Sequence, residues 1–239
     1  MRHVLTEARA SLRLQVELGE LLPPRERKQL LSRFKRISRD VESPHDESHV
    51  LTFVVQCLRR REVPGVLVEA GCFKGSSTAK FSIVASMLGK QLVVFDSFQG
   101  LPPNDEAHTE SILGHSIEGW FDQGNFRGTL DEVRAAIETY GEIEACELVP
   151  GWFEDTMPSF DRPIAAGYLD VDLASSTRTC LKHLYPLVSP GGALVSQDGD
   201  FPLVLEVFED RSFWENEVGC PMPEIDGLGQ RKMLVIERR

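Results

Sequence analysis

The chain has 239 residues, of which 41% are hydrophobic and 26% charged, which fits one soluble α/β domain with a sizeable core. Its formal net charge of −11 disfavours nucleic acid as a partner, because a phosphate backbone requires a basic surface. No run of about 18 apolar residues is present, so no membrane span is expected.

The N-terminal quarter of the chain is predicted to be helical. Apolar residues recur with helical spacing over residues 3–22 and 24–38, and the stretch "SPHDESHV" predicts a cap for a third helix over roughly residues 47–61. The basic residues of 23–39 are expected to form a solvated helix face. We therefore predict an N-terminal helical extension or substrate cap over residues 1–62. Its apolar helix faces could pair between two chains, so a homo-oligomer is possible.

From residue 63 the pattern alternates between strands and helices. The predicted strands are "GVLVEA", "QLVVFD", "ACELVPG", "IAAGYLDVDL", "GGALVSQD" and "RKMLVIERR". Three helices are predicted between them, one of them, at 129–141, with a capping box formed by Thr129 and Glu132. This order predicts a doubly wound, mostly parallel sheet over residues 63–239, with its ligands at the carboxyl ends of the strands.

A polar stretch rich in Gly and Pro follows the second strand. It covers residues 97–128, too long for a plain connector. Loops of this length inside a compact domain are usually functional. We predict that it forms a lid over the site.

The turn after the first strand, "EAGCFKGSS", has the form of a nucleotide site. Gly71 lacks a Cβ and lets a ligand approach the backbone, and Gly75 precedes a helix whose free N–H groups would face the ligand. Ser76 or Ser77 can cap that helix or donate to the ligand. Asp96, at the end of the second strand, is positioned to accept both ribose hydroxyls. A strand-to-helix turn without a ligand is the alternative.

Two cofactors use such a turn, a nicotinamide dinucleotide and S-adenosylmethionine (SAM). The form here is G-x-x-x-G, which lacks the glycine that lets a pyrophosphate touch the backbone. Glu69 would also repel a pyrophosphate, whereas it suits the amino group of a methionine moiety. The turn therefore favours SAM.

Six motifs carry a family resemblance: "VEAGCFKGSS", "DSFQGLP", "GNFRGTLDEV", "PGWFEDTMP", "YLDVDLASST" and "LYPLVSPGGALV". In this order, over about residues 66–200, they resemble the motifs of the macrocin O-methyltransferase (TylF-like) family. The resemblance implies a class I, Rossmann-like fold with a seven-stranded sheet, usually with Mg²⁺, and methylation of hydroxyls of sugars or other natural-product intermediates.

The resemblance also implies roles for single residues. Glu69 and Gly71 would flank the methionine part of SAM, and Asp96 and Ser97 would hold the ribose. Gly151, Trp152 and Phe153 would lie near the adenine. A core aromatic remains the alternative for Trp152.

Methyl transfer to a hydroxyl requires a general base or a metal ion that lowers the pKa of the hydroxyl. Asp170 and Asp172 end the fourth predicted strand, where residues two apart point the same way, and Asp198 and Asp200 follow the fifth. Such carboxylates suit Mg²⁺. The resemblance makes Asp170 and Asp198 the counterparts of metal-binding acids. Gln197 stands where the family has a further acid; its oxygen can still coordinate, or Asp200 can substitute.

Histidines offer an alternative base, although a lone loop histidine is more often at the surface. The candidates are His45, His49, His108 and His115. His183, on a helix, is expected to be structural, and Gln230 or Lys232 could line the acceptor site.

The sequence thus predicts a SAM-dependent O-methyltransferase acting on a hydroxyl of a small molecule, with catalytic Asp170 and Asp198 and with Mg²⁺ assistance left open. The alternatives are an NAD-dependent oxidoreductase and a non-catalytic SAM-binding protein. The five scattered cysteines, with no C-x-x-C, favour reduced thiols in the cytoplasm over disulfides or a zinc site.

Overall fold

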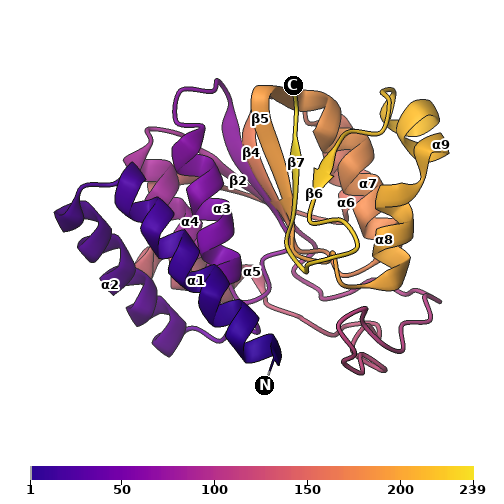
Figure 1. The fold of residues 1–239 in the computed structure, drawn as a ribbon, viewed down its shortest axis with the longest axis horizontal. Helices are drawn as coiled ribbons and strands as arrows, with labels where there is room; N and C mark the ends of the chain where they lie inside the picture. Colours follow the sequence, from indigo (N-terminus) through magenta and orange to yellow (C-terminus); the bar gives the residue numbers. More distant parts are fainter. Residues whose placement is uncertain (1) are drawn as a thin grey trace.

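The computed structural model describes the backbone of residues 2–239 and the side chains from residue 12 onward. A single seven-stranded sheet runs through the molecule with helices on both faces (Figure 1). The strands are β1 (Val66–Ala70), β2 (Leu92–Asp96), β3 (Cys146–Pro150), β4 (Ile164–Leu169), β5 (Val188–Ser196), β6 (Ile225–Asp226) and β7 (Leu234–Glu237). The longer helices are α1 (Arg2–Leu21), α2 (Pro24–Asp40), α3 (Glu47–Arg59), α4 (Ser76–Met87), α5 (Leu130–Tyr140), α7 (Ala174–Leu184) and α8 (Pro202–Glu209). Shorter turns are α6 (Phe153–Thr156), α9 (Arg211–Phe213) and a π-helical turn, Trp214–Val218.

The strand order is β3-β2-β1-β4-β5-β7-β6. The first five of these strands are parallel to their neighbours, and β7 is antiparallel to both β5 and β6. The predicted doubly wound, mostly parallel sheet is therefore confirmed. Among the strands of the described residues, only the two-residue strand β6 was not predicted from the sequence.

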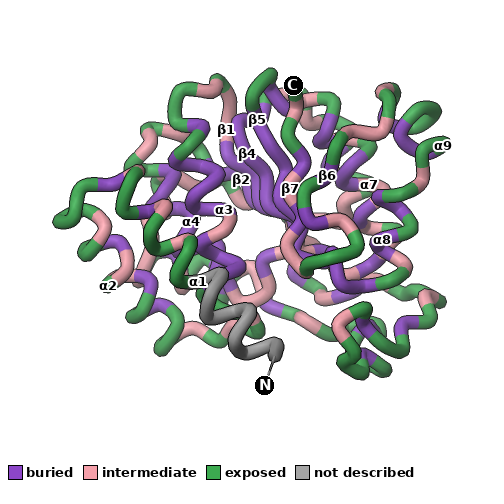
Figure 2. The backbone as a smooth tube through the Cα atoms, in the orientation of Figure 1, coloured by how far each residue is buried: buried purple, intermediate pink, exposed green. Residues whose placement is uncertain are grey.

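The central strands of the sheet are buried on both faces, as Figure 2 shows. Alternate residues of β1 face opposite cores: Leu67 packs on the side of α3 and α4, and Val68 on the side of α7 and α8. On the first side, Phe53 of α3 and Phe81 of α4 have ring centroids 4.6 Å apart, and both rings contact Tyr168 of β4. Helix α3 is thus part of the main core.

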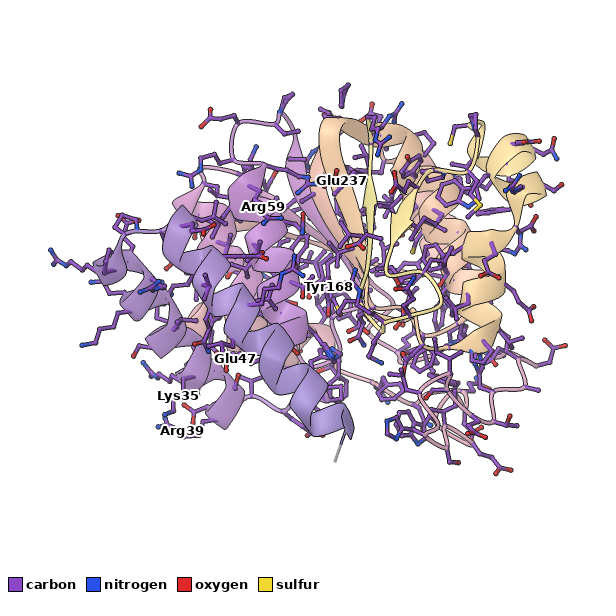
Figure 3. All side chains as sticks on the ribbon, in the orientation of Figure 1. Lys35, Arg39, Glu47, Arg59, Tyr168 and Glu237 are labelled. Carbon is purple, nitrogen blue, oxygen red and sulfur yellow. The ribbon has the colours of Figure 1, made fainter. Side chains whose placement is uncertain are left out.

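Helices α1 and α2 lie outside α3 and α4, with α1 against α3 and α2 against α4. Helix α2 buries Leu30, Phe34 and Ile37, while Lys35 and Arg39 project from its outer side (Figure 3). The predicted solvated basic face is confirmed. The boundary at residue 62 stays a prediction.

The capping box of α5 is present as predicted: Thr129 accepts from the Glu132 amide, and the Glu132 carboxylate accepts from the Thr129 amide. The prediction for the fourth strand was wrong at its end, because β4 stops at Leu169, before the acids. Among residues 2–239, no helix is long and apolar enough to cross a bilayer.

Candidate active site

A cavity of about 540 Å³ lies at the carboxyl ends of the parallel strands. Among the residues predicted for the site, those that line it are Gly71, Asp96, Ser97, Gly151, Trp152, Phe153, Asp170 and Gln197. Glu69, Gly75, Ser76, Ser77 and Asp198 do not line it. The expectation that ligands bind at the carboxyl ends of the strands therefore located the cavity. The remaining predicted residues lie near the lining residues in the chain but do not themselves face the cavity.

The glycine turn presents Gly71, Cys72 and Phe73 to the cavity. Gly71 has a φ of +81°, and a Cβ there would come 1.9 Å from the carbonyl oxygen of Asp170. A side chain is excluded because this turn packs against the backbone that carries the acids. Gly75 also has a left-handed φ, but a Cβ there would contact Val133 of α5, so its role in the structure is in helix packing.

Two turns hold the Asp96 carboxylate in place, the glycine turn after β1 and the turn after β2. Its Oδ2 accepts from the Cys72 amide and its Oδ1 from the Phe98 amide, each at 2.7 Å. Burial raises the pKa of Asp96, although these amides oppose the shift. The carboxylate is held on the cavity wall with lone pairs left on both oxygens, as recognition of two vicinal hydroxyls requires. The Ser97 hydroxyl instead donates to the Gly100 carbonyl and accepts from the Gln99 amide.

Trp152 and Phe153 follow β3 and are partly buried. Phe153 packs against a hydrophobic core, whereas Trp152 belongs to neither core of the described residues and lines the cavity. The geometry therefore leaves the Trp152 ring available to a flat ligand.

Glu69 lies in β1 and is wholly buried. Neither of its carboxylate oxygens has a hydrogen-bond partner of normal geometry among the described residues. Burial raises the pKa of Glu69 to about 8, against the opposing effect of the Ser77 and Thr78 hydroxyls. Its predicted contact with a methionine moiety stays a prediction.

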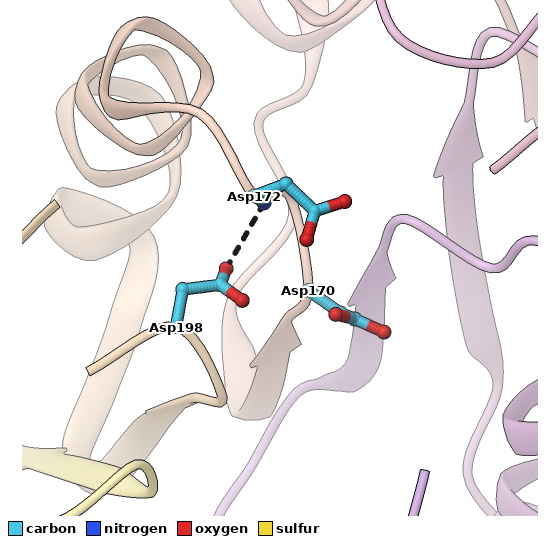
Figure 4. A group of neighbouring side chains, drawn as sticks. All are labelled: Asp170, Asp172 and Asp198. Carbon is cyan, nitrogen blue, oxygen red and sulfur yellow. Dashed lines mark hydrogen bonds between the residues drawn. The ribbon is translucent and has the colours of Figure 1, made fainter. Parts of the chain in front are cut away.

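Three carboxylates, from Asp170, Asp172 and Asp198, gather with oxygen atoms within 4.8 Å of one another (Figure 4). Strand alternation does not explain this, since β4 has already ended. The chain instead turns sharply: Asp198 Oδ2 accepts from the Val171 and Asp172 amides at 3.0 and 3.2 Å, and Asp172 has a left-handed φ of +63°. This turn directs Asp172 into the cavity and leaves Asp198 behind it.

The Asp170 carboxylate is held at both oxygens. His45 Nε2 lies 2.6 Å from Oδ2, and Gln197 Nε2 donates to Oδ1 at 2.5 Å. Burial opposes ionisation of Asp170, but attraction to His45 and its hydrogen bond outweigh burial and lower the pKa of Asp170. Burial likewise disfavours a charged His45, but Asp170 outweighs it and raises the pKa of His45. The two side chains form a buried hydrogen-bonded pair in which each favours the charged form of the other.

The other acids of the cluster are less ionised. Burial and the charge of Asp170 raise the pKa of Asp198 to about 7, and burial and Asp198 raise the pKa of Asp172 well above its ordinary value. Asp200 lies outside the group of three and pairs with Lys232 at 3.2 Å.

The donor set fits a divalent cation. Asp198 Oδ1 and Gln197 Oε1 are buried without a hydrogen-bond partner in the described chain. Oxygen atoms of carboxylates and amides are the ligands that Mg²⁺ prefers, and unpaired buried oxygens are costly unless something binds them. Asp170, Gln197 and Asp198 are the residues that would hold the ion.

The long loop, residues 97–128, contains no helix or paired strand in the described chain apart from an isolated bridge between Glu110 and Ser116. It lies below the sheet in Figure 1 and contributes Leu101, Trp120 and Phe126 to the cavity wall. It is also anchored: the Glu106 carboxylate accepts from the Ala174 and Ser175 amides at the start of α7.

Of the two histidines in the long loop, His108 differs from the expected surface position and His115 agrees with it. His108 is buried, lies 3.0 Å from Glu106 and packs on Phe121, so it neither faces solvent nor lines the cavity. His115 is exposed. His183 is a partly buried residue of α7, outside the cavity.

Some residues of the cavity wall were given little weight from the sequence, whereas Lys232 was a candidate there and does line the cavity. His45 and His49 were regarded mainly as surface residues, but both are buried on the cavity wall, where burial lowers the pKa of His49 to about 4. Lys232 lines the cavity from the C-terminal hairpin, as the sequence suggested, whereas Gln230 does not line it. Phe201, after β5, also lines the cavity and was not predicted. No local spacing in the sequence distinguishes His45, His49 or Phe201, because each reaches the site through tertiary packing.

The sequence matches the family model for Macrocin-O-methyltransferase (TylF) over residues 48–231. One relative is the 8-demethyl-8-(2,3-dimethoxy-alpha-L-rhamnosyl)-tetracenomycin-C 4'-O-methyltransferase of Streptomyces olivaceus. It is 32% identical to this chain, over 75% of this chain and 69% of the relative. The mycinamicin III 3''-O-methyltransferase of Micromonospora griseorubida is 29% identical over 75% of this chain and 72% of its own. The solved O-methyltransferase NovP superposes with a TM-score of 0.62 at 25% identity, over 79% of this chain and 77% of that one.

The sheet, the strand-end cavity and these matches define a class I SAM-dependent O-methyltransferase. The chain belongs to the macrocin O-methyltransferase (TylF) family. The comparisons do not favour the nicotinamide-dependent alternative.

Proposed function

We propose that the protein transfers the methyl group of SAM to a hydroxyl of a natural-product acceptor, most simply a sugar hydroxyl. The observation that carries the proposal is that one cavity is lined both by Asp96, placed for a ribose, and by Asp170 and Asp172, the two acids that follow β4. The names of the relatives support the acceptor class, since one acts on a rhamnosyl tetracenomycin and another on mycinamicin III.

The cofactor end of the cavity comprises the glycine turn, Asp96 and Trp152. Asp96 accepts from the ribose hydroxyls, Gly71 admits the methionine part, and Trp152 covers the adenine. Binding SAM there directs its methyl group toward the acids, because the turn at Gly71 contacts the backbone of Asp170.

At the acceptor end, Asp172 is the residue best suited to take the proton. Burial and Asp198 raise its pKa, which makes its ionised form the stronger base, and a cation held by Asp170 and Asp198 would favour that ionised form. Its carboxylate lines the cavity and makes no hydrogen bond with the described residues. In the transfer, the acceptor oxygen forms a bond to the methyl carbon, the carbon–sulfur bond breaks with its electrons remaining on sulfur, and the hydroxyl proton moves to Asp172. S-adenosylhomocysteine leaves as the second product.

Asp170 and Asp198, predicted as catalytic, are proposed to hold Mg²⁺ together with Gln197, and Asp170, which lines the cavity, also to position the acceptor. The ion would act as a Lewis acid that lowers the pKa of the acceptor hydroxyl. The orphaned oxygens of Gln197 and Asp198 support this assignment. The amide at Gln197 also motivates the second candidate, a SAM-binding protein without activity, because a neutral ligand weakens a magnesium site.

Incubation of the protein with SAM, Mg²⁺ and rhamnosyl or other deoxysugar glycosides of aromatic polyketides tests the proposal, with S-adenosylhomocysteine release and product mass as readouts. Methylation of any of these glycosides supports it. Binding of S-adenosylhomocysteine without methylation across the panel would favour the non-catalytic candidate. A cytoplasmic location, which the five free thiols suit, and a homo-oligomeric state remain part of the proposal.

A further inference from the structure

A short segment between α2 and α3, residues 41–46, crosses from the N-terminal helices to the cavity. We name it the strap. Pro44 and His45 from the strap line the cavity, as does His49 from the first turn of α3. The helical extension therefore supplies part of the wall of the site.

The strap is fixed at two places on the catalytic domain. Glu42 pairs with Lys74 of the glycine turn at 2.5 Å, and His45 Nε2 reaches Asp170 at 2.6 Å. Within the strap, the His45 amide donates to the Ser43 hydroxyl at 3.2 Å. One contact is at the surface, where Glu42 is 66% exposed, and the other is buried, where His45 is 8% exposed.

The buried contact involves the Asp170 carboxylate, which two side chains hold. Gln197 holds Oδ1 of Asp170 and His45 holds Oδ2, so the two donors fix the plane of the carboxylate. Without His45, Oδ2 of Asp170 would lose its hydrogen-bond partner, and the carboxylate could rotate away from the oxygens of Asp172 and Asp198, which now lie within 4.8 Å of it. Ligands of a metal ion are commonly oriented by such outer hydrogen bonds, and their loss weakens metal binding.

We propose, on the basis of the proposed function, that His45 is a positioning residue that holds Asp170 in the orientation required for binding a divalent cation. The N-terminal extension then completes the acid cluster, in addition to covering the acceptor. The alternative is that His45 only fastens the strap to the domain.

A matched pair of variants separates these alternatives. His45→Gln keeps an N–H donor on an unbranched side chain, and His45→Met has a similar length without the donor. Glu42→Gln removes the surface fastening of the strap and leaves the donor in place. Mn²⁺ binding to the complex with S-adenosylhomocysteine, measured by electron paramagnetic resonance, is the readout, with calorimetry of S-adenosylhomocysteine alongside.

We expect His45→Met to weaken Mn²⁺ binding by about 10- to 100-fold, the range found for lost outer partners of metal ligands. His45→Gln should recover most of the affinity, and Glu42→Gln should match the wild type. Equal Mn²⁺ affinity in wild type and His45→Met, equal losses in Glu42→Gln and His45→Met, or no Mn²⁺ binding by the wild-type complex would overturn the proposal. Failure of wild type to bind S-adenosylhomocysteine would instead contradict the proposed function.

A measurement on the wild type keeps the proposal testable even if the His45 variants do not fold. The ring N–H of His45 that is bonded to Asp170 should give a downfield proton resonance in the complex with S-adenosylhomocysteine. Titration with Mg²⁺ should shift it. A resonance that stays unchanged at saturating Mg²⁺ would contradict the coupling between His45 and the cation.

Discussion

Gly71 and Asp170 are in backbone contact: a Cβ on Gly71 would lie 1.9 Å from the carbonyl oxygen of Asp170. This contact joins the cofactor turn to the acid cluster, so the two halves of the site cannot move independently. It also explains why glycine is required at this position irrespective of any ligand.

Gly71→Ala should therefore destabilise the protein and weaken S-adenosylhomocysteine binding together. The left-handed backbone alone costs a residue with a Cβ about 1–2 kcal/mol, and the clash with a backbone oxygen adds to it. We expect a total loss above ~3 kcal/mol, the class of substitutions that strain a special backbone position. Urea unfolding and calorimetry measure the two effects.

Gly89→Ala is the matched control, because Gly89 also has a left-handed φ, +63°, but a Cβ there would meet nothing within 4 Å. It should lose only the backbone contribution and keep its affinity for the ligand. Equal losses of stability in Gly71→Ala and Gly89→Ala would show that the contact with Asp170 is unimportant.

Asp96→Asn should weaken S-adenosylhomocysteine binding by about 10- to 100-fold, because a hydrogen bond to a charged group contributes roughly 1.5–3 kcal/mol. The carboxylate now accepts hydrogen bonds from the backbone N–H groups of Cys72 and Phe98. In the variant, the side-chain NH₂ would face one of these two donors and could not accept from it. Calorimetry provides the measurement. Asp161→Asn, at an exposed position, serves as the control; unchanged affinity in Asp96→Asn would remove Asp96 from the ribose site.

Asp172→Asn should reduce turnover by about 10²- to 10⁴-fold, the range for loss of a general base, while binding of S-adenosylhomocysteine stays within a factor of about two. The reason is that Asp172 has an uncommitted carboxylate at the acceptor end, away from the cofactor turn. Single-turnover methyl transfer to an accepted glycoside measures it. Full activity in this variant would assign the proton to another group.

Glu106→Gln should destabilise the protein by about 1–2 kcal/mol near pH 7, because the carboxylate of the long loop caps the start of α7. Burial opposes its ionisation, but hydrogen bonds from His108 and from Ser175 outweigh burial and lower the pKa of Glu106 to about 2, from an ordinary 4.5. Because its pKa is lowered on folding, the ionised Glu106 stabilises the fold at pH values above its ordinary pKa, and this stabilisation is lost as the pH falls toward 2.

The difference between wild type and Glu106→Gln in urea unfolding should therefore shrink between pH 5 and pH 2. Glu110→Gln, exposed in the same loop, should show no such pH-dependent difference. A difference that is constant with pH would mean that the charge of Glu106 is not what holds the loop to α7.

The sequence was sufficient for the sheet and for the edge that carries the site, because strand period, glycine turns and strand-end acids are local signals. It was not sufficient for the way Asp172 enters the cavity, which depends on a left-handed turn held by Asp198, 26 residues further on. It also could not rank His45 above His108. Both are histidines in polar stretches, and only tertiary packing brings one to Asp170 and the other to Glu106.

The central claim is that the cavity beside Gly71 and Asp96 binds SAM, and a calorimetric titration with S-adenosylhomocysteine tests it most directly, with NAD⁺ as the competitor cofactor. We predict saturable binding of S-adenosylhomocysteine near one molecule per chain and no binding of NAD⁺. Binding of NAD⁺ in its place, or of neither compound, would contradict the account.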